Sequence, residues 1–440
     1  MVALKHIVLF GAGKSATVLI DYLKQVATEN NWNITVADSD LNAAQLKVGS
    51  HALAKAVQIN IENKEERKAL VKQADAVISM MPPSLHNLIA LDCIELNKHL
   101  LTASYVSDEI KNLHTEIAER KLIFLCEMGL DPGIDHMSAM KIFDRIKGEG
   151  GKITSFKSHC GGLIAPESDD NPWHYKISWN PKNIILAGKA GAVYKEQGNE
   201  VHLAYKDLFD ANRIVEIPGY GMYAYYPNRD SLAYISLYNL HDAHTFVRTT
   251  LRHPEFSFGW KNIVDLKLTD EEKLYDTDGM TIAGFFKAHF DKNGFSSWLY
   301  MDEATLAMKQ LFFIGLNDDT LINKGLCSAA DVLQFTAEKK LALKPGDKDM
   351  IIMMHEISYE IKGVKHEVIS SLVVKGDNSL QTAMAKTVGL PLGIAAKLIL
   401  NGKISEPGLH IPITASIYSP VLDELEKHGI IFQETEKTIQ

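Results

Sequence analysis

The chain has 440 residues, of which 46% are hydrophobic and 23% are charged, and its formal net charge is −9. This composition is typical of a globular protein with two or three domains. The acidic balance and the lack of a long basic run argue against nucleic acid or an anionic membrane as a partner. No apolar run approaches the roughly 20 residues of a membrane span.

The four cysteines, Cys93, Cys126, Cys160 and Cys327, are all more than thirty residues apart. That spacing is typical of neither a zinc ligand set nor a disulfide framework, and we assign no metal ligand. The first strand begins within about five residues of the N-terminus, which leaves no room for a signal peptide. We therefore expect reduced thiols and a cytoplasmic location.

A nucleotide-binding pattern opens the chain. Residues 6–10 form an apolar run that ends at Gly11-Ala-Gly-Lys-Ser-Ala16, helical spacing follows to about residue 26, and residues 33–38 form a second strand ending on Asp38. Strand, Gly-x-Gly-x-x-Ala turn, helix, strand and acid in this order form the dinucleotide fingerprint. Gly11 permits the tight turn, and Gly13 lets backbone amides approach a pyrophosphate at the helix N-terminus.

Asp38 favours NAD over NADP as the cofactor, without excluding NADP. Its carboxylate would accept hydrogen bonds from a ribose 2′-hydroxyl and repel a 2′-phosphate. Some of the candidate residues also have a structural interpretation that involves no cofactor. Asp38 would then be a turn residue and Lys14 a solvated surface lysine. Ser79 and Met80 would simply form the buried end of a strand. The expected cofactor contacts are Gly11, Ala12, Gly13, Lys14, Ser15, Asp38, Ser39, Ser79, Met80 and Leu130.

Strands and helices continue to alternate as far as the stretch Cys126–His136. The predicted strands are 57–59, 74–80, 99–103 and 122–126, and the predicted helices are 64–72, 84–96 and 107–119. Such alternation predicts a parallel, doubly wound sheet whose strand ends all face one ligand-binding edge. The acid-rich stretch Cys126–His136 lies at that edge by topology, or it is a plain loop with Asp131 or Asp135 as a helix cap.

Past residue 150 the alternation stops. We expect strands at 153–160, 175–179, 350–361 and 367–374, the last two forming a hairpin, and a mainly helical region over 245–340. In that region Thr269 and Glu272 match a capping box, and a helix is predicted over 304–316.

The C-terminal part shows two more helices. An apolar helix spans 383–402, a last helix begins at Ser419-Pro420 and ends at Gly429, and a strand follows at 430–432. The predicted fold class is α/β: a Rossmann-like, doubly wound parallel sheet with an inserted α+β substrate domain and a helical subdomain.

Six motifs carry a family resemblance. They are Gly129-Leu-Asp-Pro-Gly-Ile-Asp-His136, Ser104-Tyr-Val106, Cys160-Gly-Gly-Leu163, Ala165-Pro-Glu-Ser168, Tyr226-Pro-Asn-Arg-Asp-Ser231 and Thr250-Leu-Arg252. They resemble motifs of the saccharopine dehydrogenases, more narrowly the glutamate-forming saccharopine reductases of the aminoadipate pathway and the matching half of the bifunctional lysine-degrading enzyme. The similarity runs in order from the first strand to the C-terminal helix.

The resemblance implies a homodimer whose chain has three parts. These are an NAD(P)-binding domain over 1–130, completed by about 400–440; a mixed-sheet substrate and dimerisation domain over 131–245 and 345–400; and a helical subdomain over 246–344. The implied reaction interconverts saccharopine with L-glutamate and 2-aminoadipate 6-semialdehyde, through hydride transfer to the cofactor and hydrolysis of an imine. The chain lacks the lysine–ketoglutarate reductase half, so that activity would belong to a separate protein.

The resemblance also implies which residues bind this amino-acid substrate. They are Ser104, Tyr105, Asp131, Trp179, Arg229, Thr250, Leu251 and Arg252. Saccharopine has three carboxylates, and an arginine fork matches a carboxylate bidentately. The alternatives are a surface salt bridge to Asp230 for Arg229 and plain core burial for Trp179.

For proton transfer we place Asp131 first, with Tyr105 beside it. Glu127 is a further candidate, whereas His159 is a weak one because related enzymes more often have tyrosine there. Two rival functions remain open: a carboxynorspermidine-type dehydrogenase on a similar scaffold, and a non-catalytic, NAD-sensing protein. Fungal relatives that use NADP tend to have a basic residue after the second strand, where this chain has Asp38.

Overall fold

The structure is a computed structural model that describes residues 4–439. The chain forms two compact units, one made of residues up to 150 together with 380–431, the other of 151–379 together with residues from 432 onwards. These boundaries differ from the predicted ones, because the helices at 134–148 and 383–400 belong to the first unit and the last strand belongs to the second. The expectation about a signal peptide involves residues 1–3, which lie outside the described part.

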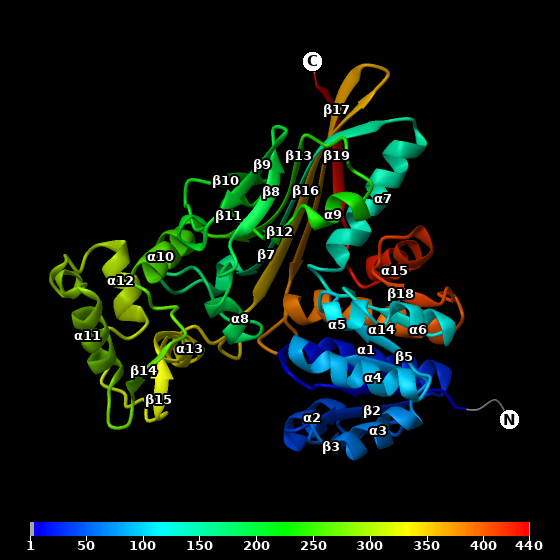
Figure 1. Cartoon of the computed structure of the whole chain (residues 1–440), viewed down its shortest axis with the longest axis horizontal. Helices are drawn as coiled ribbons and strands as arrows, with labels where there is room; N and C mark the ends of the chain where they lie inside the picture. Colours follow the sequence, from blue (N-terminus) through cyan, green and yellow to red (C-terminus); the bar gives the residue numbers. More distant parts are fainter. Residues whose placement is uncertain (1–3, 440) are drawn as a thin grey trace. The chain divides into compact units, whose positions relative to one another are not determined.

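The first unit contains a seven-stranded sheet in which every neighbouring pair is parallel. Its strands, in spatial order, are β18 (Gly408–His410), β6 (Ile123–Leu125), β5 (His99–Thr102), β4 (Ala76–Ser79), β1 (His6–Phe10), β2 (Asn33–Asp38) and β3 (Ala54–Gln58). The order 3-2-1-4-5-6 is that of dinucleotide-binding folds. The predicted doubly wound sheet is therefore confirmed, with β18 from the far end of the chain added beside β6 (Figure 1).

Nine helices of four or more residues belong to the described part of this unit. They are α1 (Thr17–Asn30), α2 (Leu41–Val48), α3 (Lys64–Gln73), α4 (His86–Glu95), α5 (Asp108–Lys111), α6 (His114–Glu119), α7 (Ile134–Gly148), α14 (Ala383–Leu400) and α15 (Ala415–Lys427). The sequence pattern missed α2, which Asp40 caps by accepting a hydrogen bond from the amide of Ala43 at 3.0 Å. It also joined α5 and α6 into one helix.

Helix α14 packs against α1 at a place where only small residues fit. A β-carbon on Gly389 would lie 2.9 Å from the amide nitrogen of Leu19, and one on Gly393 would lie 2.5 Å from the ring of Tyr22. Within residues 4–439, α14 is the one helix long and apolar enough to cross a membrane, yet 83% of it is buried inside the protein. It is therefore a core helix of the first unit.

Helix α15 begins earlier than predicted. The sequence places Pro420 at its first position, whereas the helix starts at Ala415 and contains Pro420 in its interior. A proline there costs a backbone hydrogen bond. Packing of α15 against α7 and α14, with the hydroxyl of Tyr418 donating to Asp144 at 2.6 Å, offsets that cost.

The second unit is built on a ten-stranded mixed sheet. The main path runs β10 (Ile214–Ile217), β11 (Gly221–Pro227), β13 (Thr245–Arg252), β7 (Lys152–Ile164), β16 (Asp349–Ile361), β17 (Val364–Lys375) and β19 (Gln433–Ile439), with β8 (Ala192–Glu196), β9 (Asn199–Leu203) and β12 (Arg229–Asp230) beside it. The predicted hairpin is confirmed, since β16 and β17 pair antiparallel over their whole length. Figure 1 shows the long strands of this sheet.

Helices of the second unit surround a separate, aromatic-rich core. They are α8 (Pro181–Ile185), α10 (Pro254–Asp265), α11 (Ile282–Asn293), α12 (Leu306–Phe313) and α13 (Ala329–Lys340), whereas α9 (Ala233–Leu237) contributes no residue to this core. Phe256 and Trp260 of α10 stack with ring centroids 5.1 Å apart at the centre of this core.

Two predictions for this region are wrong. Residues 175–179 make a single isolated bridge, from Ile177 to Ala342, rather than a strand. Thr269 and Glu272 do not cap a helix, because the following residues form β14 (Lys273–Asp276), which pairs with β15 (Leu326–Ser328). In both places long-range pairing outweighs the local pattern.

Substitution of Gly389 by valine should destabilise the first unit, because the new side chain would overlap the backbone of α1. We expect a loss of about 1–3 kcal/mol in the free energy of unfolding, measured by thermal or urea unfolding followed by circular dichroism. Gly148 is the matched control: it ends α7, and a β-carbon added there would meet nothing within 4 Å. Gly148→Ala should leave stability unchanged or raise it slightly, and equal stability of Gly389→Val and wild type would contradict the packing argument.

Candidate active site

The glycine turn between β1 and α1 lies at the carboxyl edge of the parallel sheet. Gly11 has a φ of +102°, its amide donates to the carbonyl of Ala37 at 2.8 Å, and a β-carbon on it would lie 3.0 Å from the carbonyl oxygen of Met80. Glycine is therefore required there for both conformation and space. Nothing lies within 4 Å of a β-carbon built on Gly13, so the backbone is open to a ligand at that position.

A short 3-10 helix, η1 (Lys14–Ala16), follows the turn and leads into α1. Neither η1 nor α1 has a side chain that caps its N-terminus. Uncapped amides at a helix start, next to an open glycine, form a phosphate-binding arrangement. Gly11 to Ser15 thus fit the pyrophosphate of a dinucleotide. A nicotinamide dinucleotide bound there would exchange hydride with a substrate.

Asp38 is held inside the turn. Its Oδ2 accepts a hydrogen bond from the amide of Ala12 at 2.6 Å and its Oδ1 accepts one from the amide of Asp40 at 2.9 Å. The ammonium group of Lys47 donates to the carbonyl oxygens of Ala12 and Gly13. Burial lowers the pKa of Lys47, while the charge of Asp38 opposes that shift. Asp38 and Lys47 therefore both stabilise the glycine turn, one by accepting from its amide and the other by donating to its carbonyls.

The other predicted cofactor residues come from neighbouring strand ends. Ser79 is buried at the end of β4, Met80 follows it, and the amide of Met80 donates to the carbonyl of Phe10 at 2.8 Å. Ser39 is exposed directly after β2, and Leu130 is buried in the loop after β6. The parallel topology brings these residues to the same edge of the sheet as the glycine turn.

The loop from Cys126 to Gly133 follows a tightly constrained path. Gly133 has a φ of +145°, and a β-carbon on it would lie 2.1 Å from the carbonyl oxygen of Gly129. The Asp131–Pro132 peptide is cis. The amide of Asp135 donates to the carbonyl of Leu130 at 3.0 Å, and α7 begins at Ile134. Only glycine fits at residue 133, so the loop has one accessible route into α7.

Buried acids hold this loop in place. Glu127 accepts a hydrogen bond from the amide of Val106 at 3.2 Å and contacts His136 Nε2 at 2.9 Å, and His136 Nδ1 lies 3.6 Å from Asp135. Glu127 has a φ of +56°, and all three residues are at most 5% exposed. These contacts give Glu127 a structural role and explain why two acids of the stretch lie inside the protein.

The same loop presents Asp131 to Tyr105. The Tyr105 hydroxyl lies 3.4 Å from Asp131 Oδ1, and both residues are half-buried. A half-buried carboxylate with a phenol beside it suits proton transfer, since each can carry or accept a proton at the reacting group. The structure thus brings together the two residues that the sequence names as catalytic.

His86 also lies at the carboxyl edge of the parallel sheet, although the sequence pattern did not single it out. It is 3% exposed at the start of α4, its Nδ1 lies 2.8 Å from the Ser79 hydroxyl, and its Nε2 lies 2.8 Å from that of Ser104. Burial lowers its pKa to about 4, so the ring is neutral near pH 7. A lone histidine in an apolar helix offers no local signal of such a role.

Arg252 is the principal cation among the predicted residues of the second unit. It ends β13, is 4% exposed, and its guanidinium lies 5.2, 5.4 and 6.0 Å from the ring centroids of Tyr175, Phe256 and Tyr226. It donates to the carbonyl of Leu251 at 2.8 Å, and its Nε has no partner in the described part of the chain. A buried guanidinium surrounded by aromatic rings is prepared to bind an anion.

The remaining predicted substrate residues lie around β13 and β12. Trp179 is half-buried and points its ring nitrogen at the Tyr175 hydroxyl, 3.4 Å away, while Leu251 is fully buried and Thr250 half-buried. Gly161 gives Leu251 room, because a β-carbon on it would lie 2.7 Å from that of Leu251. Arg229 is exposed with a φ of +49°. Trp179 thus lies with Tyr175 beside Arg252, whereas Arg229 stands on the surface.

His159 is not available as a base. Its Nδ1 contacts the Thr249 hydroxyl at 2.7 Å and its Nε2 contacts Glu356 at 3.0 Å. Burial raises the pKa of Glu356, but the hydrogen bond and charge of His159 and the charge of Lys157 outweigh it, so the pKa is lowered. Both ring nitrogens are therefore engaged in holding neighbouring strands of the sheet together.

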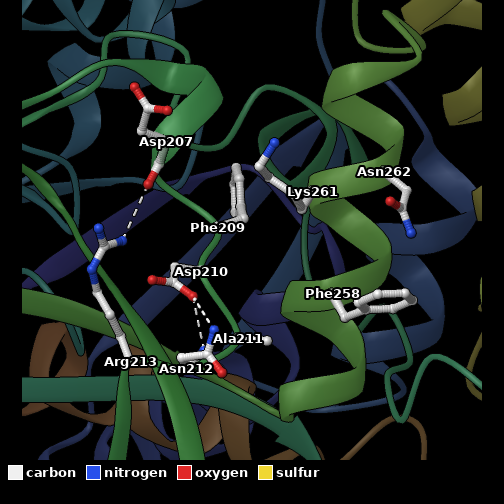
Figure 2. A pocket seen from close by; sticks show the side chains of 9 residues that line it. All are labelled: Asp207, Phe209, Asp210, Ala211, Asn212, Arg213, Phe258, Lys261 and Asn262. Carbon is white, nitrogen blue, oxygen red and sulfur yellow. Dashed lines mark hydrogen bonds between the residues drawn. The ribbon is translucent and has the colours of Figure 1, made fainter.

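A cavity of about 460 Å³ lies elsewhere in the second unit. Figure 2 shows it beside α10, with Phe258, Lys261 and Asn262 on the helix and, facing them, Asp207 and residues 209–213. None of its lining residues is a predicted site residue. We therefore place the chemistry at the strand ends, where the predicted site residues gather.

Comparison with known proteins identifies the family. Residues 7–125 match the family model "Saccharopine dehydrogenase NADP binding domain" and residues 129–430 match "Saccharopine dehydrogenase C-terminal domain". The chain is 33% identical to the alpha-aminoadipic semialdehyde synthase of Arabidopsis thaliana over 97% of this chain and 44% of that protein. It spans about half the length of the semialdehyde synthases that it matches.

Fungal relatives match along their whole length. The chain is 31% identical to the saccharopine dehydrogenase [NADP(+), L-glutamate-forming] of Saccharomyces cerevisiae, over 98% of this chain and 99% of that protein. The solved apo structure of a saccharopine dehydrogenase (L-Glu forming) from the same organism superposes with a TM-score of 0.86 at 30% identity, covering 99% of this chain and 100% of that chain.

These findings correct the expected cofactor. The matching domain is described as NADP-binding, and the fungal relatives are named as NADP(+)-dependent, so the preference for NAD is wrong. The physical reason lies in the turn: both carboxylate oxygens of Asp38 accept backbone hydrogen bonds there, so its presence does not indicate a ribose contact. On its sequence, its fold and its domain order, the chain belongs to the saccharopine dehydrogenase family.

Proposed function

We propose that the protein is an NADP-dependent, L-glutamate-forming saccharopine dehydrogenase. It would interconvert saccharopine, NADP⁺ and water with L-glutamate, 2-aminoadipate 6-semialdehyde, NADPH and a proton. The observation that carries the proposal is Arg252, a buried guanidinium among aromatic rings with no carboxylate partner in residues 4–439. A buried cation of this kind requires an anion from a ligand, and saccharopine offers three carboxylates.

The remaining groups suit the steps of such a reaction. Gly11 to Ser15 would hold the pyrophosphate of NADP, with the turn braced by Asp38 and Lys47. Bound NADP⁺ would supply the acceptor for hydride from the carbon next to the secondary amine, and water would then hydrolyse the resulting substrate imine. Asp131 would take the proton from the attacking water, and the Tyr105 hydroxyl would orient the Asp131 carboxylate.

The substrate roles of the other predicted residues follow from their chemistry. In the first unit Ser104 would offer a hydroxyl. In the second unit Thr250 would offer a hydroxyl and Trp179 an apolar surface, the carbonyl of fully buried Leu251 would hold the Arg252 guanidinium, and exposed Arg229 would attract a second carboxylate. Four described cysteines that are all free and buried support the proposed cytoplasmic location. A homodimer is proposed from the family resemblance, and light scattering of the purified protein tests it.

The reaction itself is the first test. Purified protein mixed with saccharopine and NADP⁺ should form reduced cofactor, followed by its absorbance, and the products should include glutamate. Turnover of carboxynorspermidine but not of saccharopine would replace the proposed substrate. Cofactor binding without turnover of either compound would show a non-catalytic protein.

Arg252→Met should weaken saccharopine binding while leaving the fold intact, because methionine keeps an unbranched side chain but removes the cation. Loss of a charged hydrogen bond worth about 2 kcal/mol corresponds to a fall of about 30-fold in kcat/KM. Arg213→Met is the matched control in the same unit, since Arg213 donates to the carbonyls of Asp207 and Leu208 and is not among the predicted substrate residues. Unchanged kcat/KM for Arg252→Met would remove Arg252 from the substrate site.

Asp131→Asn should lower kcat by about 100-fold or more, because an amide cannot accept the proton from water. Tyr105→Phe should have a smaller effect, since the carboxylate remains. Both variants are assayed at saturating saccharopine and NADP⁺. Turnover close to that of wild type in Asp131→Asn would show that Asp131 holds the substrate rather than moving its proton.

A further inference from the structure

His86 links two predicted site residues that come from different strands. Its Nδ1 contacts the hydroxyl of Ser79, at the end of β4, and its Nε2 contacts the hydroxyl of Ser104, directly after β5, each at 2.8 Å. The hydroxyl of Thr102 lies 3.2 Å from the same Nε2 and accepts the amide hydrogen of Ser104 at 3.2 Å. The imidazole therefore bridges the ends of two adjacent strands at the ligand-binding edge.

The ring is held in its neutral form. Burial lowers the pKa of His86 to about 4, and its place as the first residue of α4 adds the positive end of the helix dipole, which also disfavours an imidazolium. A neutral imidazole has one N–H and one lone pair. When one ring nitrogen donates a hydrogen bond to one serine, the other must accept one from the second serine. The orientations of the two hydroxyls are thereby coupled.

Such coupling matters because a serine hydroxyl rotates freely unless a partner fixes it. A hydroxyl that is already oriented stabilises a reacting group without being reordered during the reaction. Within residues 4–439, His86 forms side-chain hydrogen bonds with Ser79, Ser104 and Thr102, and with neither Asp131 nor Glu127. Any effect on the reaction would therefore pass through Ser79 and Ser104.

We propose that His86 is a positioning residue that orients the Ser104 hydroxyl toward the substrate and the Ser79 hydroxyl toward the nicotinamide cofactor. The role of His86 toward Ser104 and the substrate rests on the proposed function. Its role toward Ser79, called the cofactor half below, concerns cofactor binding alone. It assigns a role to a buried histidine that the chemistry of hydride and proton transfer does not itself require.

Replacing His86 by each of two amide residues separates its role toward Ser104 from its role toward Ser79. The amide of asparagine lies about where Nδ1 lies and that of glutamine about where Nε2 lies, so His86→Asn keeps a partner for Ser79 and His86→Gln keeps one for Ser104. Loss of one oriented hydrogen bond corresponds to about a tenfold effect. His86→Asn should lower kcat with saccharopine about tenfold and leave NADPH affinity, measured by fluorescence titration, within twofold. His86→Gln should weaken NADPH binding and change kcat less.

Serine substitutions provide a check that does not disturb the histidine. Ser104→Ala should reproduce the kinetic pattern of His86→Asn, and Ser79→Ala that of His86→Gln. The double variant His86→Asn with Ser104→Ala should have a kcat no lower than that of either single variant, because both substitutions remove the same contact, that between His86 and Ser104. His6→Asn is the matched histidine control: His6 bonds Thr35 at 2.8 Å at the opposite, amino-terminal end of β1.

Thermal unfolding of every variant without ligands shows whether a change acts through folding. The proposal is overturned if His86→Asn and His86→Gln alter kcat and NADPH affinity in the same proportion, or if neither alters them. If wild type does not oxidise saccharopine, the proposed function fails. The fluorescence titrations then still decide the cofactor half: stronger weakening in His86→Gln supports it, and equal affinity in both variants refutes it.

Discussion

The close approach of two backbone segments determines the geometry at the end of the parallel sheet. A side chain on Gly133 would collide with the carbonyl oxygen of Gly129, so the chain can fold back on itself only with glycine at that position. This turn directs Asp131 toward Tyr105 and starts α7 with Asp135 and His136 buried. In the same loop, the Glu127 carboxylate accepts a hydrogen bond from the amide of Val106. The reactive groups of the first unit therefore depend on a backbone contact that involves none of them.

Ionisable groups in the two units serve two different purposes. Asp38 and Lys47 satisfy backbone groups of the glycine turn, and Glu127 of the loop contacts His136 of α7. Arg252 differs, because its guanidinium is buried among aromatic rings without a carboxylate partner in the described chain. A buried charge that the protein itself neutralises maintains structure, whereas one left without a counter-ion is prepared for a ligand. This distinction needs side-chain geometry, and residue spacing does not supply it.

Local patterns predicted the first unit well, because its strands are short apolar runs separated by helices of ordinary length. Errors occurred where distant segments decide the outcome: pairing of β14 with β15 replaced the expected cap at Thr269, and packing of α15 carried a helix through Pro420. The position of Asp38 at the end of β2 was predicted correctly, but the preference for NAD drawn from it was wrong, since its backbone partners became known only from the folded turn. His86 went unnoticed because its partners lie seven, sixteen and eighteen residues away along the chain.

The first unit is discontinuous, and this has a consequence for synthesis on the ribosome. Helix α14, which covers Leu19 and Tyr22 of α1, and strand β18, which completes the sheet beside β6, are made only after the whole intervening second unit, residues 151–379. At roughly 5–20 residues per second, the delay lasts on the order of tens of seconds. During that time the nascent nucleotide-binding half exposes an apolar helix face and an open sheet edge. Protection by chaperones would matter most in this interval.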